Sequence, residues 1–221
     1  MRLLFVSHSL PPEDRPMDNI GGMQRVATDL HDSLLSHGDA DIRTLVLRSP
    51  WSQRHWRTPI FMAQAIRQIW KLAAANEIDA VLFSSMVTAS LAVPLRRHLS
   101  RHGVISAAIA NGLDATTPTW PYPHFVKKVF DSLDLVLPIS NATAAACRER
   151  GLSQEKCSVV LLGIRLDRFS APPSRSEARE RMLARFLSPA VEPELVLCSV
   201  GRLVPRKGVA WFIDEVMPTL P

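Results

Sequence analysis

The chain alternates short apolar runs with longer amphipathic stretches along most of its length. The apolar runs are five to eight residues long and carry few charges; they span residues 3–7, 42–47, 80–85, 104–110, 135–140, 158–163 and 194–201. Runs of this length that lack polar alternation are typical of strands buried on both faces, as in a parallel sheet. The pattern therefore predicts a sheet covered on both sides.

The stretches between these runs have the length and periodicity of helices. Candidate helices span residues 22–37, 59–76, 87–101, 123–132, 141–150 and 175–187. Strands and helices in alternation imply right-handed crossovers between parallel strands. We expect an α/β, Rossmann-like, doubly wound and mostly parallel sheet, in which ligands bind at the carboxyl ends of the strands.

The composition changes after Phe169. Two pairs of prolines, Pro172 and Pro173, then Pro189 and Pro193, flank a charged helix pattern. Such a proline-bounded polar insert is typical of a linker between domains. We predict a first domain over 1–170, a linker with one helix over 171–193, and the first strand, loop and helix of an incomplete second Rossmann-like domain over 194–221. Because one strand and one helix cannot bury both faces of that strand, we expect the chain to be a fragment that is inactive alone.

Charge and cysteine usage limit the class of protein. Lys and Arg outnumber Asp and Glu by 26 to 21, and 21 of the 26 are Arg, which binds phosphate and carboxylate in a bidentate manner. Anionic ligands or an anionic membrane surface are therefore expected partners; nucleic acid is not, because no recognition module with interleaved aromatics is present. The three cysteines, with Cys198 inside an apolar run, lack metal spacing and predict buried free thiols. No signal peptide or membrane span is predicted, so we expect a cytoplasmic protein.

Gly21 and Gly22 separate the first strand from a strongly periodic helix. Glycines there allow a ligand close to the backbone, and the free N–H groups at a helix start attract phosphate or sugar oxygens. The alternative is a turn or cap that merely needs a positive φ. The pair does not form the dinucleotide-binding pattern of spaced glycines, so hydride transfer has little support.

Asn111, Gly112 and Asp114 follow the fourth strand. Thr116, Thr117 and Trp120 come next, and hydroxyls, a carboxamide and an aromatic suit a sugar, which offers hydroxyl groups and apolar ring faces. An Asn-Gly turn with a local carboxylate cap is the alternative.

Arg202 and Lys207 lie on a strand-to-helix turn, GRLVPRKG. The turn is not a Walker A loop, because Lys207 precedes the glycine and Val209 takes the place of the metal-binding hydroxyl. The two cations are placed to bracket a diphosphate with fixed charge, with no metal and no other cofactor. A charged surface loop is the alternative.

In this order, the motifs resemble the retaining, nucleotide-sugar-dependent glycosyltransferases of family four, which have the GT-B fold of two facing Rossmann-like domains. The resemblance rests on residues 3–37, the GLD turn at 112–114, LVLPISNATAAACRERG at 135–151, LLGIRLDRF at 161–169 and SVGRLVPRKGVAWF at 199–212. It implies metal-independent transfer of a sugar from a nucleotide-diphosphate donor with retention. It also implies that Arg202 and Lys207 bind the donor diphosphate, and that Gly21 and Gly22 lie near the donor phosphates and the acceptor.

The sequence departs from the family pattern at two places. Asn111 stands where many relatives have a histidine, and an asparagine cannot shuttle a proton, so the catalytic residue is unknown. Relatives usually have Asn-Gly-Val/Ile-Asp at the linker entrance; this chain keeps Gly163, but Leu162 and Arg165 stand where those relatives have the asparagine and the aspartate. A non-catalytic Rossmann-like binding module and, less favoured, a sugar-nucleotide epimerase remain alternatives.

The donor's nucleotide and sugar are not readable, and the acceptor is expected to be a sugar or a lipid-linked sugar. Three basic stretches with aromatic residues, at 51–57, 67–71 and 124–128, suit peripheral contact with an anionic membrane, placing the protein at the inner membrane surface. Ordinary amphipathic helix surface is the alternative.

Overall fold

The computed structural model describes residues 1–19, 21–38, 40–112, 117, 122–164, 166, 171–186, 196–201 and 203–220, apart from the side chains of Pro123, His124 and Arg206. The chain divides into two compact units, Met1–Ile164 and Arg165–Pro221. The domain and linker boundaries proposed from the sequence stay a prediction.

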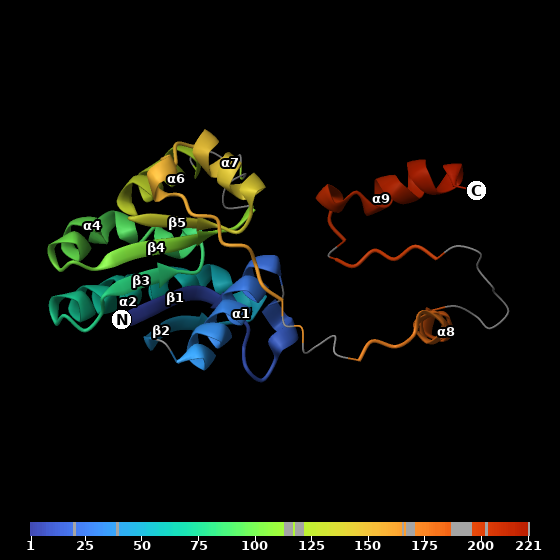
Figure 1. Cartoon of the computed structure of the whole chain (residues 1–221), viewed down its shortest axis with the longest axis horizontal. Helices are drawn as coiled ribbons and strands as arrows, with labels where there is room; N and C mark the ends of the chain where they lie inside the picture. The colour runs from blue at the N-terminus through green and yellow to red at the C-terminus, as the bar shows by residue number, and fades with distance from the viewer. Residues whose placement is uncertain are drawn as a thin grey trace. The chain divides into compact units, whose positions relative to one another are not determined.

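The first unit contains a parallel sheet of five strands in the order β2-β1-β3-β4-β5 (Figure 1). The strands are β1 (Arg2–Leu10), β2 (Asp41–Arg48), β3 (Ala80–Phe83), β4 (Ile105–Ala110) and β5 (Leu135–Pro138). Each coincides with one of the predicted apolar runs. The predicted α/β class with a doubly wound parallel sheet is confirmed.

Helices connect these strands, and the following ones lie within the described residues of the first unit. They are α1 (Gly22–His37), α2 (Arg54–Ala74), α3 (Met86–Ala89), α4 (Ala92–Arg101), α6 (Tyr122–Ser132) and α7 (Asn141–Glu149), with short 3-10 turns η1 (Pro16–Asn19), η2 (Trp51–Gln53) and η3 (Gln154–Lys156). The predicted helix over 87–101 is in fact two helices, α3 and α4. Helix α2 begins five residues before its predicted start, because η2 leads directly into it.

The two faces of the sheet pack against different helices. On one face, Leu3 and Phe5 pack against Val26, Leu30 and Leu34 of α1. Alternate β1 residues on the other face belong to a larger core with α2, α4 and α6, which includes Leu4, Val6, Ala65, Ile69, Ala73, Leu95, Leu99, Val129 and Phe130. Burial on both faces explains why the strands are apolar throughout.

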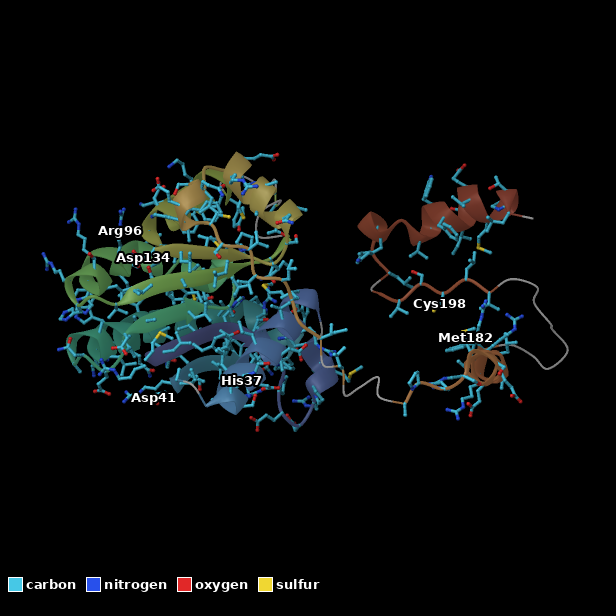
Figure 2. All side chains as sticks on the ribbon, in the orientation of Figure 1. His37, Asp41, Arg96, Asp134, Met182 and Cys198 are labelled. Carbon is cyan, nitrogen blue, oxygen red and sulfur yellow. The ribbon has the colours of Figure 1, made fainter. Side chains whose placement is uncertain are left out.

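Ion pairs and hydrogen bonds fix the amino ends of the strands. Asp79, just before β3, accepts a hydrogen bond from the Arg2 backbone N–H at 2.7 Å and pairs with the Arg2 guanidinium. Asp134, labelled in Figure 2 just before β5, accepts from the backbone N–H and from the hydroxyl of Ser106 in β4, each at 2.8 Å. These carboxylates hold strand register on the edge opposite to the one where ligands are expected.

The prediction of a strand at 158–163 is wrong. The Ser158 N–H donates to the Val136 carbonyl oxygen at 3.1 Å, and the Val160 N–H donates to that of Pro138 at 2.9 Å, so the segment starts alongside β5. It does not continue as a strand, and Leu161 is 73% exposed.

The second unit contains α8 (Arg175–Phe186), the 3-10 turn η5 (Pro205–Lys207) and α9 (Val209–Trp211), which continues through the π-helical turn η6 (Phe212–Val216) and the 3-10 turn η7 (Met217–Thr219). The strand predicted at 194–201 is also wrong for its described part. Residues 196–200 are not a strand, because no strand among the described residues pairs with them, and Val200 is 94% exposed. Cys198, labelled in Figure 2, is exposed rather than buried.

Candidate functional site

The carboxyl ends of the strands meet along one edge of the first unit. The order of strands reverses between β1 and β3, because β2 lies beyond β1 on one side and β4 beyond β3 on the other. In open α/β sheets such a reversal opens the crevice where ligands bind. Here Ser84, the residue after β3, donates a hydrogen bond from its hydroxyl to the hydroxyl oxygen of Ser7 in β1 at 2.9 Å.

This edge is lined by buried polar side chains. They include Ser7, His8, Ser9, Asn19, Gln24, Ser49, Ser84, Ser85, Thr88 and Asn111. A buried polar group costs free energy unless it is hydrogen-bonded. The large number of buried polar groups at this edge therefore indicates a site built for polar contacts rather than for packing.

Gly21 is the residue before α1, and its backbone is extended, with φ −166° and ψ 167°. The alternative that this glycine serves a positive φ is therefore wrong. Its lack of a side chain has a packing reason, because a Cβ there would lie 2.4 Å from Oε1 of Gln24. Gly22 begins α1, and a Cβ on it would meet nothing within 4 Å. Gly22 is thus the glycine whose open side is available to a ligand.

Three side chains connect this helix start to β1 and α2. Nε2 of Gln24 donates to Oγ of Ser9 at 2.9 Å, and Nη1 of Arg54 donates to the same oxygen at 3.3 Å. Arg54 is the first residue of α2, so Ser9 links helices that cover opposite faces of the sheet. None of the three was predicted as a site residue, and Arg54 was singled out only as part of the basic stretch 51–57.

His8 is 1% exposed, and its Nδ1 has no hydrogen-bond partner among the described residues. Burial and, second, the charge of Arg54 lower the pKa of the imidazole to about 4. The ring is therefore neutral near pH 7. His8 was not predicted from the sequence because the predicted strand ends at Ser7, although a histidine directly after an apolar strand run was a usable signal.

Asn111 directly follows β4 and is buried. The next residue, Gly112, lies beside the start of α7, where a Cβ on the glycine would be 4.0 Å from Oγ1 of Thr143. Ser140 caps that helix by accepting the Thr143 N–H at 3.1 Å. The structure thus brings the Asn111 turn to the same sheet edge as Gly21 and Gly22. Asp114 lies outside the described residues.

Lys207 is exposed in the second unit and precedes Gly208, whose φ of 67° is in the left-handed region that favours glycine. Both residues line a pocket with a volume of about 640 Å³. The rest of its lining is mostly apolar and comes from residues 197–199 and 209–217, including Cys198 and Trp211. The glycine makes the sharp turn that places Lys207 at the start of α9. Arg202, its predicted companion, lies outside the described residues.

No group of three or more His, Cys, Asp and Glu side chains in the described part of the chain is arranged to hold a metal ion. None of the helices in that part has the length and apolar character needed to cross a bilayer.

The chain matches no protein-family model. No curated protein matches it significantly in sequence. Its fold is similar to that of solved structures of Anabaena HepE. The structure with UDP-glucose aligns with a TM-score of 0.52 and 13% identity over 82% of this chain and 50% of that one. The structure with UDP and glucose gives a TM-score of 0.52 and 12% identity over 81% and 50%.

The structure of HepE with UDP gives a TM-score of 0.50 and 14% identity over 82% and 50%. The chain thus spans about half the length of the structures it matches. At these identities the likeness shows the fold alone, and this agrees with the expected Rossmann-like architecture.

Proposed function

We propose that the chain belongs to a GT-B glycosyltransferase of family four, which transfers a sugar from a nucleotide-diphosphate sugar to an acceptor with retention and without a metal. The observation that carries the proposal is the polar carboxyl edge between β1 and β3, where Gly22 opens α1 toward the crevice. The shared fold with HepE, which was solved with UDP and with UDP-glucose, supports a nucleotide-sugar donor.

The residues proposed to bind the donor are Arg202, Lys207 and Gly22. Arg202 and Lys207 bind the donor diphosphate and stabilise the charge of the departing nucleotide. The turn at Gly208 holds Lys207 at the start of α9. Gly22 allows the donor phosphates near the free N–H groups of α1. Gly112 and Asp114 are the proposed acceptor-side and sugar-side residues, and Asn111, the candidate at the catalytic position, donates a hydrogen bond rather than shuttling a proton.

Because the chain spans about half the length of the HepE structures that it matches, we propose that the 221-residue chain is inactive alone. The test compares this chain with the longest product that its gene encodes, using a panel of nucleotide sugars and following release of the nucleotide. The longer product should transfer sugar with retention, and Arg202→Ala and Lys207→Ala should each lower the rate by about 10²-fold.

Other outcomes of this assay separate the alternatives. Binding of a nucleotide sugar without transfer supports a non-catalytic binding module, and a sugar product with altered stereochemistry and no acceptor supports an epimerase. A longer product that neither binds nor transfers any nucleotide sugar contradicts the proposal.

A peripheral membrane contact is a second proposal, with a lipid-linked acceptor at the cytoplasmic membrane surface. Trp56 and Ile60 are 52% and 54% exposed near the start of α2, next to Arg57, so apolar and cationic side chains share one surface. Sedimentation with liposomes that contain or lack anionic lipid tests this contact. Absence of binding to anionic liposomes at low salt contradicts it.

A further inference from the structure

Helices α2 and α4 form a surface whose charged side chains are all cationic. The two helices pack into the same core on one face of the sheet, and neither contains an aspartate or a glutamate. The exposed cations toward their C-terminal ends are Arg67 and Lys71 of α2 and Arg96 (labelled in Figure 2), Arg97 and Arg101 of α4. Among the described residues none of these cations forms an ion pair, whereas α1, α6 and α8 each contain an ion pair across one helical turn. Unpaired charges of one sign on one surface attract a polyanion.

The indole of Trp70 lies flat where α2 meets α4. Its ring is stacked on that of His98 in α4, with the ring centroids 3.6 Å apart and an angle of 12° between the planes. Nε2 of His98 donates to the carbonyl oxygen of Trp70 at 2.9 Å, so the imidazole that supports the indole is itself fixed to α2. His98 is buried but Trp70 is 49% exposed, so the face of the indole away from His98 is open to a ligand.

A fixed indole with cations beside it fits a charged sugar. The C–H groups on one side of a sugar ring form an apolar face that packs on an aromatic ring. Arg67 precedes Trp70 by three residues and Arg101 follows His98 by three, so each arginine lies one helical turn from the stacked pair. Guanidinium groups in these places match a carboxylate or phosphate substituent of a sugar in a bidentate manner.

Two other polyanions fit this surface less well. An anionic membrane takes up aromatic side chains that insert among its lipids, whereas the indole of Trp70 is held against His98. Single-stranded nucleic acid stacks successive bases on several aromatic rings. Residues 64–74 and 95–101 contain no Phe, Tyr or Trp other than Trp70.

The stacked pair lies away from the candidate site. Helix α2 leads into β3 and α4 leads into β4, so the last turns of both helices lie near the amino ends of these strands. The candidate site is at the carboxyl ends. The 21 residues of α2 span about 30 Å from one edge toward the other, so only a ligand of several sugar units reaches from the crevice to Trp70.

We propose that Trp70, with Arg67 and Arg101 beside it, binds an anionic oligosaccharide, whose sugars carry carboxylate or phosphate groups. This oligosaccharide is the acceptor of the proposed transfer, held at a distance from its reacting end. The inference rests on the proposed function for the choice of a sugar as the ligand.

The test measures binding of oligogalacturonate, an anionic oligosaccharide, to the 221-residue chain by isothermal titration calorimetry at low salt. A neutral malto-oligosaccharide of equal length and an oligoglutamate of equal charge are the reference ligands, because the first lacks the charge and the second lacks the sugar ring. We expect saturable binding of oligogalacturonate that is about tenfold tighter than that of either reference. Trp70→Ala should weaken it about tenfold or more, because the indole is the central contact.

Trp56→Ala is the matched control, since Trp56 is an indole of similar exposure, 52%, near the other end of α2. It should leave the affinity within about twofold of the parent chain. Circular dichroism of Trp70→Ala verifies that the fold is retained. The double variant Arg67→Gln with Arg101→Gln leaves the stacked rings intact and should weaken binding about fivefold or more.

Several outcomes overturn the proposal. They are the absence of saturable binding, equal effects of Trp70→Ala and Trp56→Ala, and a reference ligand that binds as tightly as oligogalacturonate. Anionic liposomes or a single-stranded oligonucleotide that bind more tightly than oligogalacturonate, and lose affinity in Trp70→Ala, assign the surface to that partner instead.

Failure of this site and failure of the proposed function give different results. Sugar transfer by the longer gene product without oligogalacturonate binding removes the Trp70 site and leaves the proposed function. Oligogalacturonate binding that depends on Trp70, in a longer product that neither binds nor transfers any nucleotide sugar, keeps a site for anionic sugars and contradicts both the proposed transfer and the acceptor role.

Discussion

The Gln24 side chain reaches back across the start of α1 and donates from Nε2 to Oγ of Ser9 at the end of β1, over 2.9 Å. This contact requires the space beside Gly21, since a Cβ on that glycine would lie 2.4 Å from Oε1 of Gln24. A glycine pair that suggests a ligand site in sequence thus divides into two roles. Gly21 admits a neighbouring side chain, and Gly22 leaves the helix start open.

Gly21→Ala should destabilise the fold by about 1–3 kcal/mol, because the buried carboxamide must move and lose its hydrogen bond to Ser9. Gly22→Ala should change stability by less than about 1 kcal/mol, since a Cβ there meets nothing within 4 Å and alanine favours a helix. Urea unfolding of both variants measures the difference.

A double-mutant cycle isolates the cause of the Gly21 effect. In a Gln24→Ala background the alanine at position 21 has no carboxamide to displace, so Gly21→Ala should cost much less than it does in the parent chain. Equal costs in the two backgrounds would show that the Gln24 contact is not the reason for the glycine.

His8 should make stability depend on pH in the weakly acidic range. Burial, and then the charge of Arg54, lower its pKa to about 4 from 6.5. The unfolded state therefore binds more protons between these values, and the stabilisation is complete above pH 6.5 and is lost as the pH falls toward 4. The loss at pH 5 relative to pH 7 should be about 2 kcal/mol.

Urea midpoints at pH 7 and pH 5 measure this effect. His8→Gln should flatten the difference between the two midpoints, whereas His37→Gln should not, because His37 is exposed at the end of α1. A His8→Gln protein that keeps the full difference contradicts the assignment.

Asp79 and Arg2 should control stability at lower pH. Hydrogen bonds from the Arg2 side chain and backbone lower the pKa of Asp79 to about 2 from 3.8. A carboxyl group whose pKa is lower in the folded state stabilises the fold above the unfolded pKa, and this contribution is lost as the pH falls through 3.8 toward 2. Asp79→Asn should lower the urea midpoint at pH 7 and reduce its fall below pH 4.

Asp14→Asn provides the comparison for Asp79. Asp14 also pairs with an arginine, but its side chain is 74% exposed and its pair joins adjacent residues, so its removal should leave the midpoint unchanged. An effect of Asp14→Asn equal to that of Asp79→Asn would indicate a general charge effect instead of the specific Arg2 contact.

Local patterns were sufficient to predict the sheet and most helices. Helix α1 has its predicted bounds because the apolar stripe of Val26 and Leu30 ends before Gly38, which caps the helix at a φ of 70°. Apolarity alone failed at 158–163 and 196–201, because a strand also needs a neighbouring strand for its backbone hydrogen bonds. A run of sequence does not indicate whether that neighbour is available.

The candidate site was predicted only in part, because its contacts join residues that are distant in sequence. The turns at Gly21 and Asn111 were found since each follows an apolar run directly. Ser9 and Arg54 are 45 residues apart, and their contact depends on how α2 crosses the sheet. Sequence patterns place residues on elements but do not show which distant side chains meet.

Ser140 at the start of α7 should contribute about 1 kcal/mol to stability as a helix cap. Its hydroxyl oxygen accepts the Thr143 N–H at 3.1 Å, and Thr143 lies beside Gly112, so the cap also supports the turn that carries Asn111. Ser140→Ala should lower the unfolding free energy by that amount in urea. Ser153→Ala is the matched control, because Ser153 precedes η3 without a side-chain capping bond and should be neutral. Equal losses in the two variants would contradict the capping role of Ser140.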